Sequence, residues 1–417
     1  MKKGKSLFLG FGLLIGAVSI VQGGTLDTIL ANLKGIDTIE DDGNYHTGYL
    51  YNAKVTYRVI NGNNNHQLEP DERIYFKVVS SNGDVIETPT DGVPRSQIVD
   101  WVKAHSSAIA KIVVGGGGGI SSVSQGAGYS NNTAVMMGEI GLDSAVPNWK
   151  SGAFAQKVWK RLKVLEGEGN QTFDQSQWNF KFRGEYGSFN TWGDKGHTQL
   201  IGVTGERELN FQWKIGGVLS FRYAKVDDQW GTNSRTLTFI PYLHYRFSPY
   251  SNGTINIMPY VGGSAIFSDA SNFPEVDYFE YGWGVNIVPT YLFNPQFQGE
   301  LLISYYWDKK YVPSSSLPDN YKFLSTAINN LKPDQILTLG VGFHYLPAPH
   351  WKVSGNVLRL QHLLTKEVES GRDKAIYYRL KADYSRKNWS VGAGLRVVTQ
   401  LEEYRETDLV ANFQYRW

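Results

Sequence analysis

The sequence predicts an all-β fold: a twelve-stranded antiparallel up-and-down transmembrane β-barrel with a small N-terminal α+β region. Three observations indicate it. Apolar and polar residues alternate along twelve C-terminal segments, the connections between them are alternately short and long, and the N-terminus is typical of a secretory signal. Successive strand side chains point to opposite faces, so each segment has one apolar face and one more polar face.

The composition agrees with such a barrel. The 417 residues carry a formal net charge of +2, which argues against a dedicated nucleic-acid-binding protein. A polar mean hydropathy accompanies 25 Tyr and 12 Trp, which suits a wall that is apolar outside and polar inside. The chain has no cysteine, so disulfides, thiolate metal sites and a lipoprotein anchor are excluded.

Residues 1–23 are predicted to be a cleaved signal peptide. Lysines are frequent in the first five residues, an apolar core covers residues 7–21, and Val21-Gln22-Gly23 provides a small-residue cleavage site. The apolar core is shorter than the roughly 20 residues that a membrane-spanning helix needs. The protein is therefore expected to leave the cytoplasm without a helical membrane anchor.

Residues 24–150 are predicted to be a small N-terminal domain and a linker. Two segments, 54–60 and 73–79, have the composition of strands, and Asn-Gly turn signals lie beside them. A helix is expected from Pro94 to about Ile112, because apolar residues recur there at helical spacing.

The predicted linker begins at the glycine run 115–119, which ends this helix because fixing so many glycines is entropically unfavourable. A Ser/Gly/Asn-rich stretch follows as far as Asn132 and is expected to be flexible. Within residues 151–169, a second helix is expected at 153–165, with an apolar face and several Lys and Arg on the rest of its surface.

Residues 170–417 are predicted to form the barrel. Alternation begins at Trp178, Phe180 and Phe182, and the approximate spans of the eleven further strands are 198–208, 213–226, 236–247, 254–267, 278–292, 298–311, 334–345, 351–362, 375–385, 389–399 and 408–417. Each is long enough to cross a bilayer as a tilted strand of about 9–11 residues. The total is even, as in bacterial outer-membrane barrels.

The connections provide an independent test of this reading. The gaps after every second strand are short, and those between them are longer, up to the stretch from Val312 to Pro333. Outer-membrane barrels have short periplasmic turns and longer outer loops. Both ends of the barrel are therefore expected on the periplasmic side; the alternative is a secreted all-β protein whose connections happen to alternate.

The signal sequence, the twelve-strand meander and the terminal Phe413-Gln414-Tyr415-Arg416-Trp417 resemble an outer-membrane β-barrel protein of a double-membraned bacterium. The resemblance implies that Phe413, Tyr415 and Trp417 form the signal for the barrel-assembly machinery. It also implies periplasmic chaperones, outer-membrane lipids and lipopolysaccharide as partners. A twelve-strand C-terminal barrel entered through a helix further resembles an autotransporter translocator, over about residues 153–417. The region before it departs from the family, because it is short and shows no repeat.

If the aromatic-rich face meets lipid, the other face lines the lumen. The basic residues expected there are Lys181, Arg183, Lys214, Arg222, Arg246, Lys352, Arg379, Lys381, Arg396 and Arg416. The acidic residues expected there are Glu185, Glu206, Glu300 and Asp383. Ten cations against four anions would give a positive potential and an anion preference in an open bore. The alternative is a set of charges that pair across the bore.

Two classes of function remain. In the first, an autotransporter-like translocator, the helix at 153–165 threads the lumen and the N-terminal domain is exported. In the second, a porin-like channel passes anionic solutes and the N-terminal domain stays in the periplasm. An enzyme is not expected, because no catalytic set can be placed on adjacent strands and His244 and His344 are lone lumen residues. No metal site or cofactor is expected, since the histidines lack ligand spacing.

Overall fold

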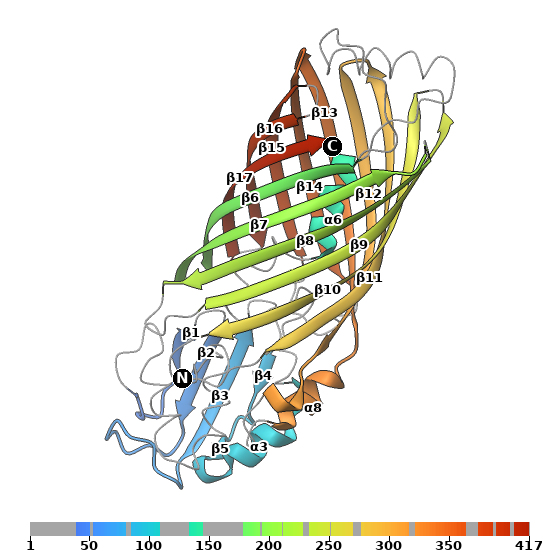
Figure 1. The fold of residues 1–417 in the computed structure, drawn as a ribbon. Coiled ribbons are helices and arrows are strands. Elements are labelled where there is room, and N and C mark those ends of the chain that lie inside the picture. The colour runs from blue at the N-terminus through green and yellow to red at the C-terminus, as the bar shows by residue number, and fades with distance from the viewer. Residues whose placement is uncertain are drawn as a thin grey trace, which may run out of the picture.

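The computed structural model describes residues 39–50, 53–80, 85–108, 133–144, 178–191, 194–210, 212–227, 233–250, 252–269, 277–316, 322–363, 374–386, 389–400 and 404–416. Within these residues, twelve strands close into an antiparallel barrel, and a five-stranded sheet precedes it in the chain (Figure 1). The predicted fold class is confirmed.

The barrel is an up-and-down meander in which strands that are neighbours in sequence pair with each other, and the last strand pairs with the first. Its strands are β6 (Trp178–Thr191), β7 (Asp194–Glu208), β8 (Trp213–Val226), β9 (Asn233–Tyr250), β10 (Gly253–Asp269), β11 (Tyr278–Asn294), β12 (Phe297–Tyr311), β13 (Asp334–Ala348), β14 (Trp351–His362), β15 (Lys374–Arg386), β16 (Trp389–Gln400) and β17 (Tyr404–Arg416).

Each strand corresponds to a predicted segment, but several continue further toward the long loops. The last strand, for example, begins at Tyr404 rather than at residue 408. Its first residues are polar, yet they pair in register with β16, as Thr407 does with Val397. The backbone ladder forms whatever the side chains are, so an apolar pattern underestimates the length of a strand.

The two faces of the barrel differ in chemistry. Outward-facing Ile201 is 72% exposed, whereas inward-facing Glu406 and Asp408 on β17 are 0% exposed. An apolar outer wall around a polar interior, in a sheet without open edges, is the arrangement of an outer-membrane β-barrel.

None of the helices that the structure describes has the length and hydropathy needed to cross a membrane.

From β7 to β15 the connections alternate in length as predicted, but the connection between β6 (ending at Thr191) and β7 (beginning at Asp194), which was expected to be long, is as short as the turns. Short turns use a recurring device: Asn294 Oδ1 accepts hydrogen bonds from the backbone N–H groups of Gln296 and Phe297, and Asn210 makes the same pattern between β7 and β8. These are Asx-type turns, in which the side chain imitates a backbone turn.

The longest predicted loop contains structure that the sequence did not reveal. It carries a 3-10 turn, η3 (Ser314–Ser316), and the helix α8 (Lys322–Asn329). Ser325 donates a hydrogen bond to the carbonyl of Val312 at 2.7 Å, and Asn329 bonds both the N–H and the carbonyl of Val312. The loop is therefore tied back to the end of β12.

The N-terminal sheet contains β1 (His46–Leu50), β2 (Ala53–Val59), β3 (Arg73–Ser80), β4 (Val85–Glu87) and β5 (Val93–Pro94). The order is β1-β2-β3-β4, and β5 also pairs with β3. The two predicted strands are confirmed as β2 and β3. The predicted helix begins as η2 (Arg95–Gln97) and continues as α3 (Ile98–Ala104). Ile109 and Ile112, which were predicted to continue it, lie outside the described residues.

A buried carboxylate, Asp41, organises the loop between β2 and β3. Its oxygens accept hydrogen bonds from the backbone N–H groups of Asn65 and His66, at 2.9 and 3.2 Å. Burial alone would raise the pKa of Asp41, but these hydrogen bonds outweigh it and hold the pKa below its usual value. Gly62 is required here, because a Cβ at that position would clash with the backbone carbonyl oxygen of Asp41.

Several predicted segments fall outside the described residues. They are the signal peptide 1–23, the glycine run 115–119 with the stretch to Asn132, the helix at 153–165, and Trp417.

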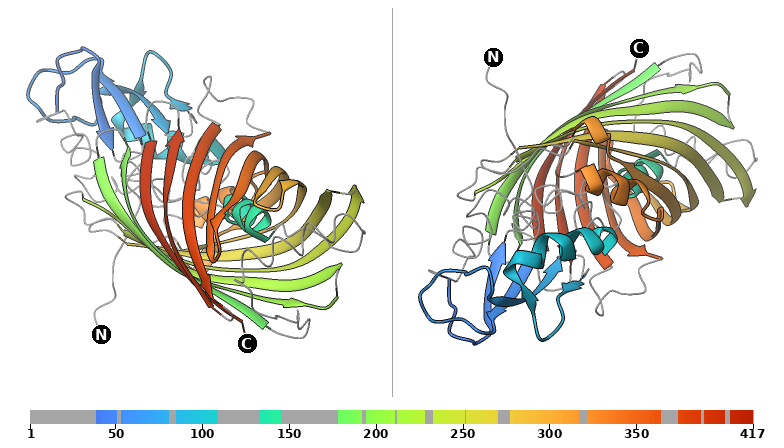
Figure 2. Two further views of the ribbon diagram at one scale, coloured as in Figure 1. Left: turned by 90° about the horizontal axis from the view of Figure 1, so that it is seen from above. Right: turned by 90° about the horizontal axis from the view of Figure 1, so that it is seen from below.

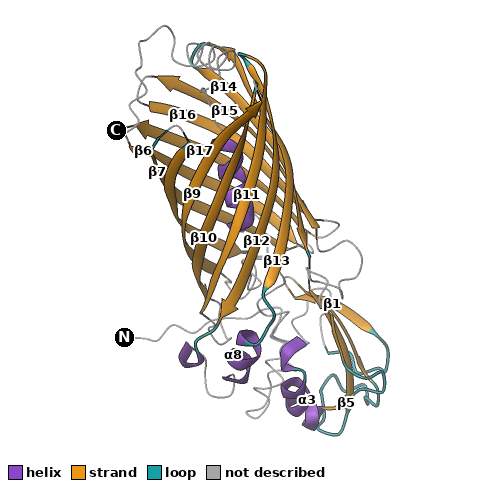
Figure 3. Cartoon of the chain, turned by 90° about the vertical axis from the view of Figure 1, so that its right-hand side faces the viewer, coloured by secondary structure: helices purple, strands orange, loops and turns teal. Residues whose placement is uncertain are grey.

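A helix that the sequence did not predict, α6 (Thr133–Ser144), lies inside the barrel. Figure 2 shows it within the ring of strands when the barrel is viewed along its length. Figures 1 and 3 place the N-terminal sheet beyond the end of the barrel that carries α8, which is the end with the long loops.

Candidate functional site: the bore and its internal helix

Helix α6 lies between apolar side chains on one side of the bore, the apolar wall, and arginines on the other, the charged wall; buried charged residues such as Glu280 and Asp308 also lie on β11 and β12. Helix α6 packs against strands β10–β14. The inward side chains of this wall include Met258, Val288, Leu302 and Leu358, all buried. The opposite wall, formed by β15–β17 and β6, contributes arginines, which face the other side of α6.

Two glycines bring α6 close to the apolar wall. A Cβ on Gly138 would lie 2.9 Å from Leu302 Cδ2, and a Cβ on Gly141 would lie 3.0 Å from Asn286 Nδ2. The same Asn286 amide donates a 2.6 Å hydrogen bond to the carbonyl oxygen of Met137. A larger residue at Gly138 would have to displace the helix or the wall.

The direction of α6 follows from these contacts. Gly138 lies at the level of Leu302, whereas Leu142 lies beside Gly342, which pairs in register with Glu300. From its first to its last residue, the helix therefore runs toward Phe297, where β12 begins after a short turn. It enters at the long-loop end of the bore and points toward the short-turn end, where β6 also begins at Trp178.

Glu139 is the centre of the charged contact. Its carboxylate Oε2 lies 2.8 Å from Arg183 Nη2, 3.5 Å from Arg379 Nη1 and 3.7 Å from Arg396 Nη1. The side chain is 1% exposed. Arg379 and Arg396 are direct cross-strand neighbours, so their like charges would repel each other without an acid between them.

Asp143 makes a second contact one helical turn later. Its two oxygens accept hydrogen bonds from Arg379 at 2.7 and 3.2 Å, and Lys381 Nζ lies 3.7 Å away. Residues four apart share a helix face, so Glu139 and Asp143 present both acids of α6 to the same wall.

Arg396 joins the helix to the seam of the barrel. It is 1% exposed, it contacts Glu185 on β6, and its Nη2 lies 2.8 Å from Asp408 on β17. Arg183 also contacts Glu185. The strands that close the barrel and the helix inside it are therefore held by one ion-pair network.

The other predicted cations also have acidic partners. Lys181 and Lys214 lie 3.6 and 3.4 Å from Glu206, and Lys352 lies 3.5 Å from Asp383. Two further pairs are Arg222 with Glu406 at 2.9 Å and Arg246 with Glu208 at 3.0 Å. The side chain of Arg416 lies outside the described residues.

The four predicted acids are all buried in the structure: Glu185, Glu206, Glu300 and Asp383. The expected charge count, however, omitted several acids. Buried strand residues that were missed are Glu280, Asp308, Glu406 and Asp408, and α6 adds Glu139 and Asp143. With these acids present, each predicted cation whose side chain is described has an acidic partner, so the expected excess of positive charge does not describe this bore.

The two lumen histidines are held by neighbours. His344 Nε2 lies 2.8 Å from Glu300, and His244 Nε2 lies 3.1 Å from the Asn256 amide oxygen. The residues that the structure describes contain no group of three or more side chains arranged to hold a metal ion. The ion pairs hold a short acidic helix against the charged wall. The helix occupies the bore.

Sequence comparisons with protein-family models and with curated proteins give no match. Among solved structures, the chain is similar to the translocator domain of the autotransporter NalP from Neisseria meningitidis, with a TM-score of 0.44, 11% identity, and coverage of 65% of this chain and 99% of that one. It is also similar to the transport unit of the autotransporter AIDA-I from Escherichia coli, with a TM-score of 0.41, 8% identity, and coverage of 64% and 99%.

A third similar structure is an outer membrane channel from Pseudomonas putida F1, with a TM-score of 0.40, 12% identity, and coverage of 60% of this chain and 100% of that one. Translocators and channels thus both appear among the similar structures. At these identities the likeness concerns the barrel fold and does not separate the two.

Proposed function

We propose that this protein is an autotransporter-like translocator of the bacterial outer membrane, which exports its own N-terminal domain and keeps α6 in the bore afterwards. The observation that carries the proposal is the direction of α6. The helix runs from the long-loop end to the short-turn end, so the chain that precedes it emerges among the long loops. Long loops face the cell exterior in outer-membrane barrels.

The ion-pair network supports this role. A helix that only filled space would need no acids, yet α6 places both of its acids against arginines and a lysine. Ion pairs that are buried and fix a register act as specificity devices in several proteins. In a translocator, such pairs would stop the chain at one position in the bore.

The partners follow from this role. The barrel is surrounded by outer-membrane lipids, including lipopolysaccharide. Periplasmic chaperones and the barrel-assembly machinery would act on it before insertion, with Phe413, Tyr415 and Trp417 as the assembly signal. A cleaved signal peptide at 1–23 would deliver the chain to the periplasm.

The absence of cysteine allows a direct test. Ser96 is an exposed residue of η2 in the N-terminal domain, so S96C creates one reactive thiol there. Intact cells are treated with a maleimide that cannot cross the outer membrane. Labelling of S96C on intact cells is the expected result.

The matched control is Q296C. Gln296 is exposed in the short turn between β11 and β12, and only its backbone takes part in the hydrogen bonds of that turn. Q296C should be labelled only after the outer membrane is opened. If S96C behaves like Q296C, the N-terminal domain is periplasmic and the proposal fails. A channel with a periplasmic domain would then be the better description.

A further inference from the structure

The outer wall of the barrel carries an asymmetry of charge that the bore does not explain. Among the described residues, six strands carry an outward-facing basic side chain close to their long-loop end. These residues are Lys195, Lys225, Arg235, Lys309, Arg359 and Arg405. At the short-turn end, the described outward-facing basic residues are Arg207 and Arg386. No outward-facing strand residue whose side chain the structure describes is acidic.

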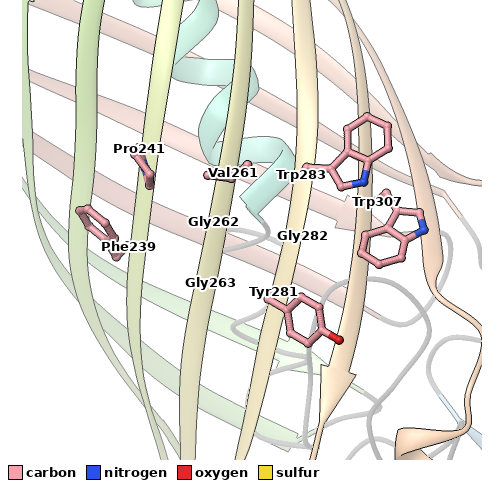
Figure 4. Close-up of a pocket in the computed structure, with 9 residues that line it drawn as sticks. All are labelled: Phe239, Pro241, Val261, Gly262, Gly263, Tyr281, Gly282, Trp283 and Trp307. Atoms are coloured by element: carbon pink, nitrogen blue, oxygen red, sulfur yellow. The ribbon is translucent and has the colours of Figure 1, made fainter.

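Next to one of these residues, Lys309, the lipid-facing wall is hollowed. An open groove of about 530 Å³ crosses β9–β12, and Figure 4 shows the residues that line it. Its walls carry the rings of Phe239, Tyr281, Trp283 and Trp307. Gly263 faces outward on β10 between these rings and offers no side chain, which leaves the floor open.

Lys309 and Arg235 lie on the side of the groove that faces the long loops. Lys309 shares the outward face of β12 with Trp307 and pairs in register with Tyr281. Two residues beyond Trp307, Lys309 lies about 7 Å further toward the long-loop end. Arg235 lies at the long-loop end of β9, on the same face as Phe239 of the groove and about 13 Å further along the strand. Aromatic side chains of this kind mark the level of lipid headgroups in membrane proteins.

The chemistry indicates one class of occupant. An apolar groove that begins at this level accepts an acyl chain, because its lining offers hydrophobic and dispersion contacts. Lys and Arg at headgroup level bind phosphate, Arg through paired N–H donors and Lys as a point charge. A zwitterionic lipid would be repelled as much as attracted by a purely basic rim, whereas a lipid whose headgroup is phosphorylated and anionic would be attracted.

We propose that the groove and its rim, Lys309 and Arg235, bind a phosphorylated glycolipid of the outer leaflet, with an acyl chain in the groove and a headgroup phosphate on the rim. The assignment to the outer leaflet rests on the proposed orientation, in which the long loops face the cell exterior. The binding chemistry itself depends only on the wall of the barrel.

The test uses the full-length protein, purified in a neutral detergent, with phosphorylated lipid A as the probe and dephosphorylated lipid A as its matched control. Native mass spectrometry measures both affinities. The protein should bind the phosphorylated lipid more tightly. Each basic residue near an anionic lipid contributes about a fivefold gain, so K309Q should bind about fivefold more weakly and K309Q/R235Q about 25-fold.

Two further variants locate the site. R207Q removes an exposed arginine at the short-turn end and should bind lipid A as the wild type does. G263L fills the floor of the groove and should weaken both lipids. G184L is its control, because Gly184 faces outward on β6 and a Cβ there would meet nothing within 4 Å. Heat-modifiable mobility on gels verifies that each variant forms a barrel.

Equal affinity for the two lipids, or an unchanged affinity in K309Q/R235Q, would overturn the proposal. The charge variants alter only the outer wall, so this outcome does not depend on G263L folding. Failure of the translocator proposal is seen separately, in the labelling of S96C on intact cells, which lipid binding in detergent does not affect.

Discussion

Glu139, on the helix inside the bore, lies 2.8 Å from Arg183 on the first barrel strand, although the two belong to segments joined by a long stretch of chain. This ion pair is one of three that Glu139 makes with arginines of the charged wall. It connects the element that fills the bore with the strands that close the barrel. The position of the helix therefore depends on the assembled barrel.

Replacing Glu139 should release α6. E139Q keeps the shape of the side chain but leaves Arg183, Arg379 and Arg396 without its carboxylate. Breaking a buried ion pair costs about 3 kcal/mol or more, which corresponds to more than a hundredfold in an opening equilibrium. Hydrogen exchange of the peptide covering residues 133–144 should accelerate accordingly, and conductance in planar bilayers should rise.

The matched control is E208Q. Glu208 also pairs with an arginine, Arg246, but the two residues lie on β7 and β9, outside the strands β10–β14 against which α6 packs, and Glu208 is partly exposed. E208Q should leave exchange in α6 and the conductance unchanged. Unchanged exchange in E139Q itself would show that the apolar wall alone holds the helix.

The apolar wall can be tested by overpacking. G138L introduces a side chain whose Cβ would lie 2.9 Å from Leu302 Cδ2, so the helix should shift and lose about 1–3 kcal/mol of binding to the wall. L302A removes the opposing side chain, and the double variant G138L/L302A should recover most of the loss. Hydrogen exchange in α6 measures both. If L302A does not rescue G138L, the close contact is not what limits the size of this residue.

The sequence predicted the barrel well because its strands carry a period of two over long segments. Tilted membrane strands need only an apolar outer face, and residues such as Ile201 and Leu409 reveal that face without any knowledge of the partner strand. The closing pair, β17 with β6, also follows once the number of strands is even. Strand ends were less predictable, because polar residues continue the ladder.

The contents of the bore were not predictable in the same way. Helix α6 follows a Gly/Ser/Asn-rich stretch, and two glycines at 138 and 141 lower its intrinsic helix propensity. Its stability comes from the barrel that surrounds it. A signal that could have revealed this helix is the i,i+4 spacing of Glu139 and Asp143, which contact basic residues that the strand pattern had directed inward.

Acid should loosen the N-terminal sheet through Asp41, whose pKa in the folded protein is lowered by hydrogen bonds from Asn65 and His66 that outweigh its burial. The unfolded pKa is about 3.9. Because the folded value is lower, this stabilisation is complete above the unfolded pKa and is lost as pH falls through the folded pKa. D41N should cost about 2 kcal/mol at neutral pH and less in acid.

The measurement is hydrogen exchange in β2 and β3 of the full-length protein, with wild type and D41N compared at the same pH. D91N is the control, since Asp91 pairs with Arg73 at 2.9 Å but is 76% exposed, and exposed pairs contribute little. D91N should differ little from wild type at any pH. A constant difference between wild type and D41N across the pH range would assign the effect to a cause other than the ionisation of Asp41.

Variants on the two sides of the seam between β17 and β6 can distinguish a structural role of the C-terminal aromatic residues from a role as an assembly signal. Phe413 and Phe182 pair in register across the seam, with ring centroids 6.4 Å apart. F413A and F182A remove the same ring contact, which is worth about 1 kcal/mol, from opposite strands. In purified refolding, the two variants should therefore fold with similar efficiency.

In cells the two variants should differ. If Phe413 belongs to the signal read by the assembly machinery, F413A should accumulate as unassembled protein, while F182A should assemble nearly as well as wild type. Heat-modifiable mobility of newly made protein measures the assembled fraction. Equal defects in cells would mean that Phe413 acts only through its ring contact with Phe182, and the proposed assembly signal would then have to reside in Tyr415 or Trp417.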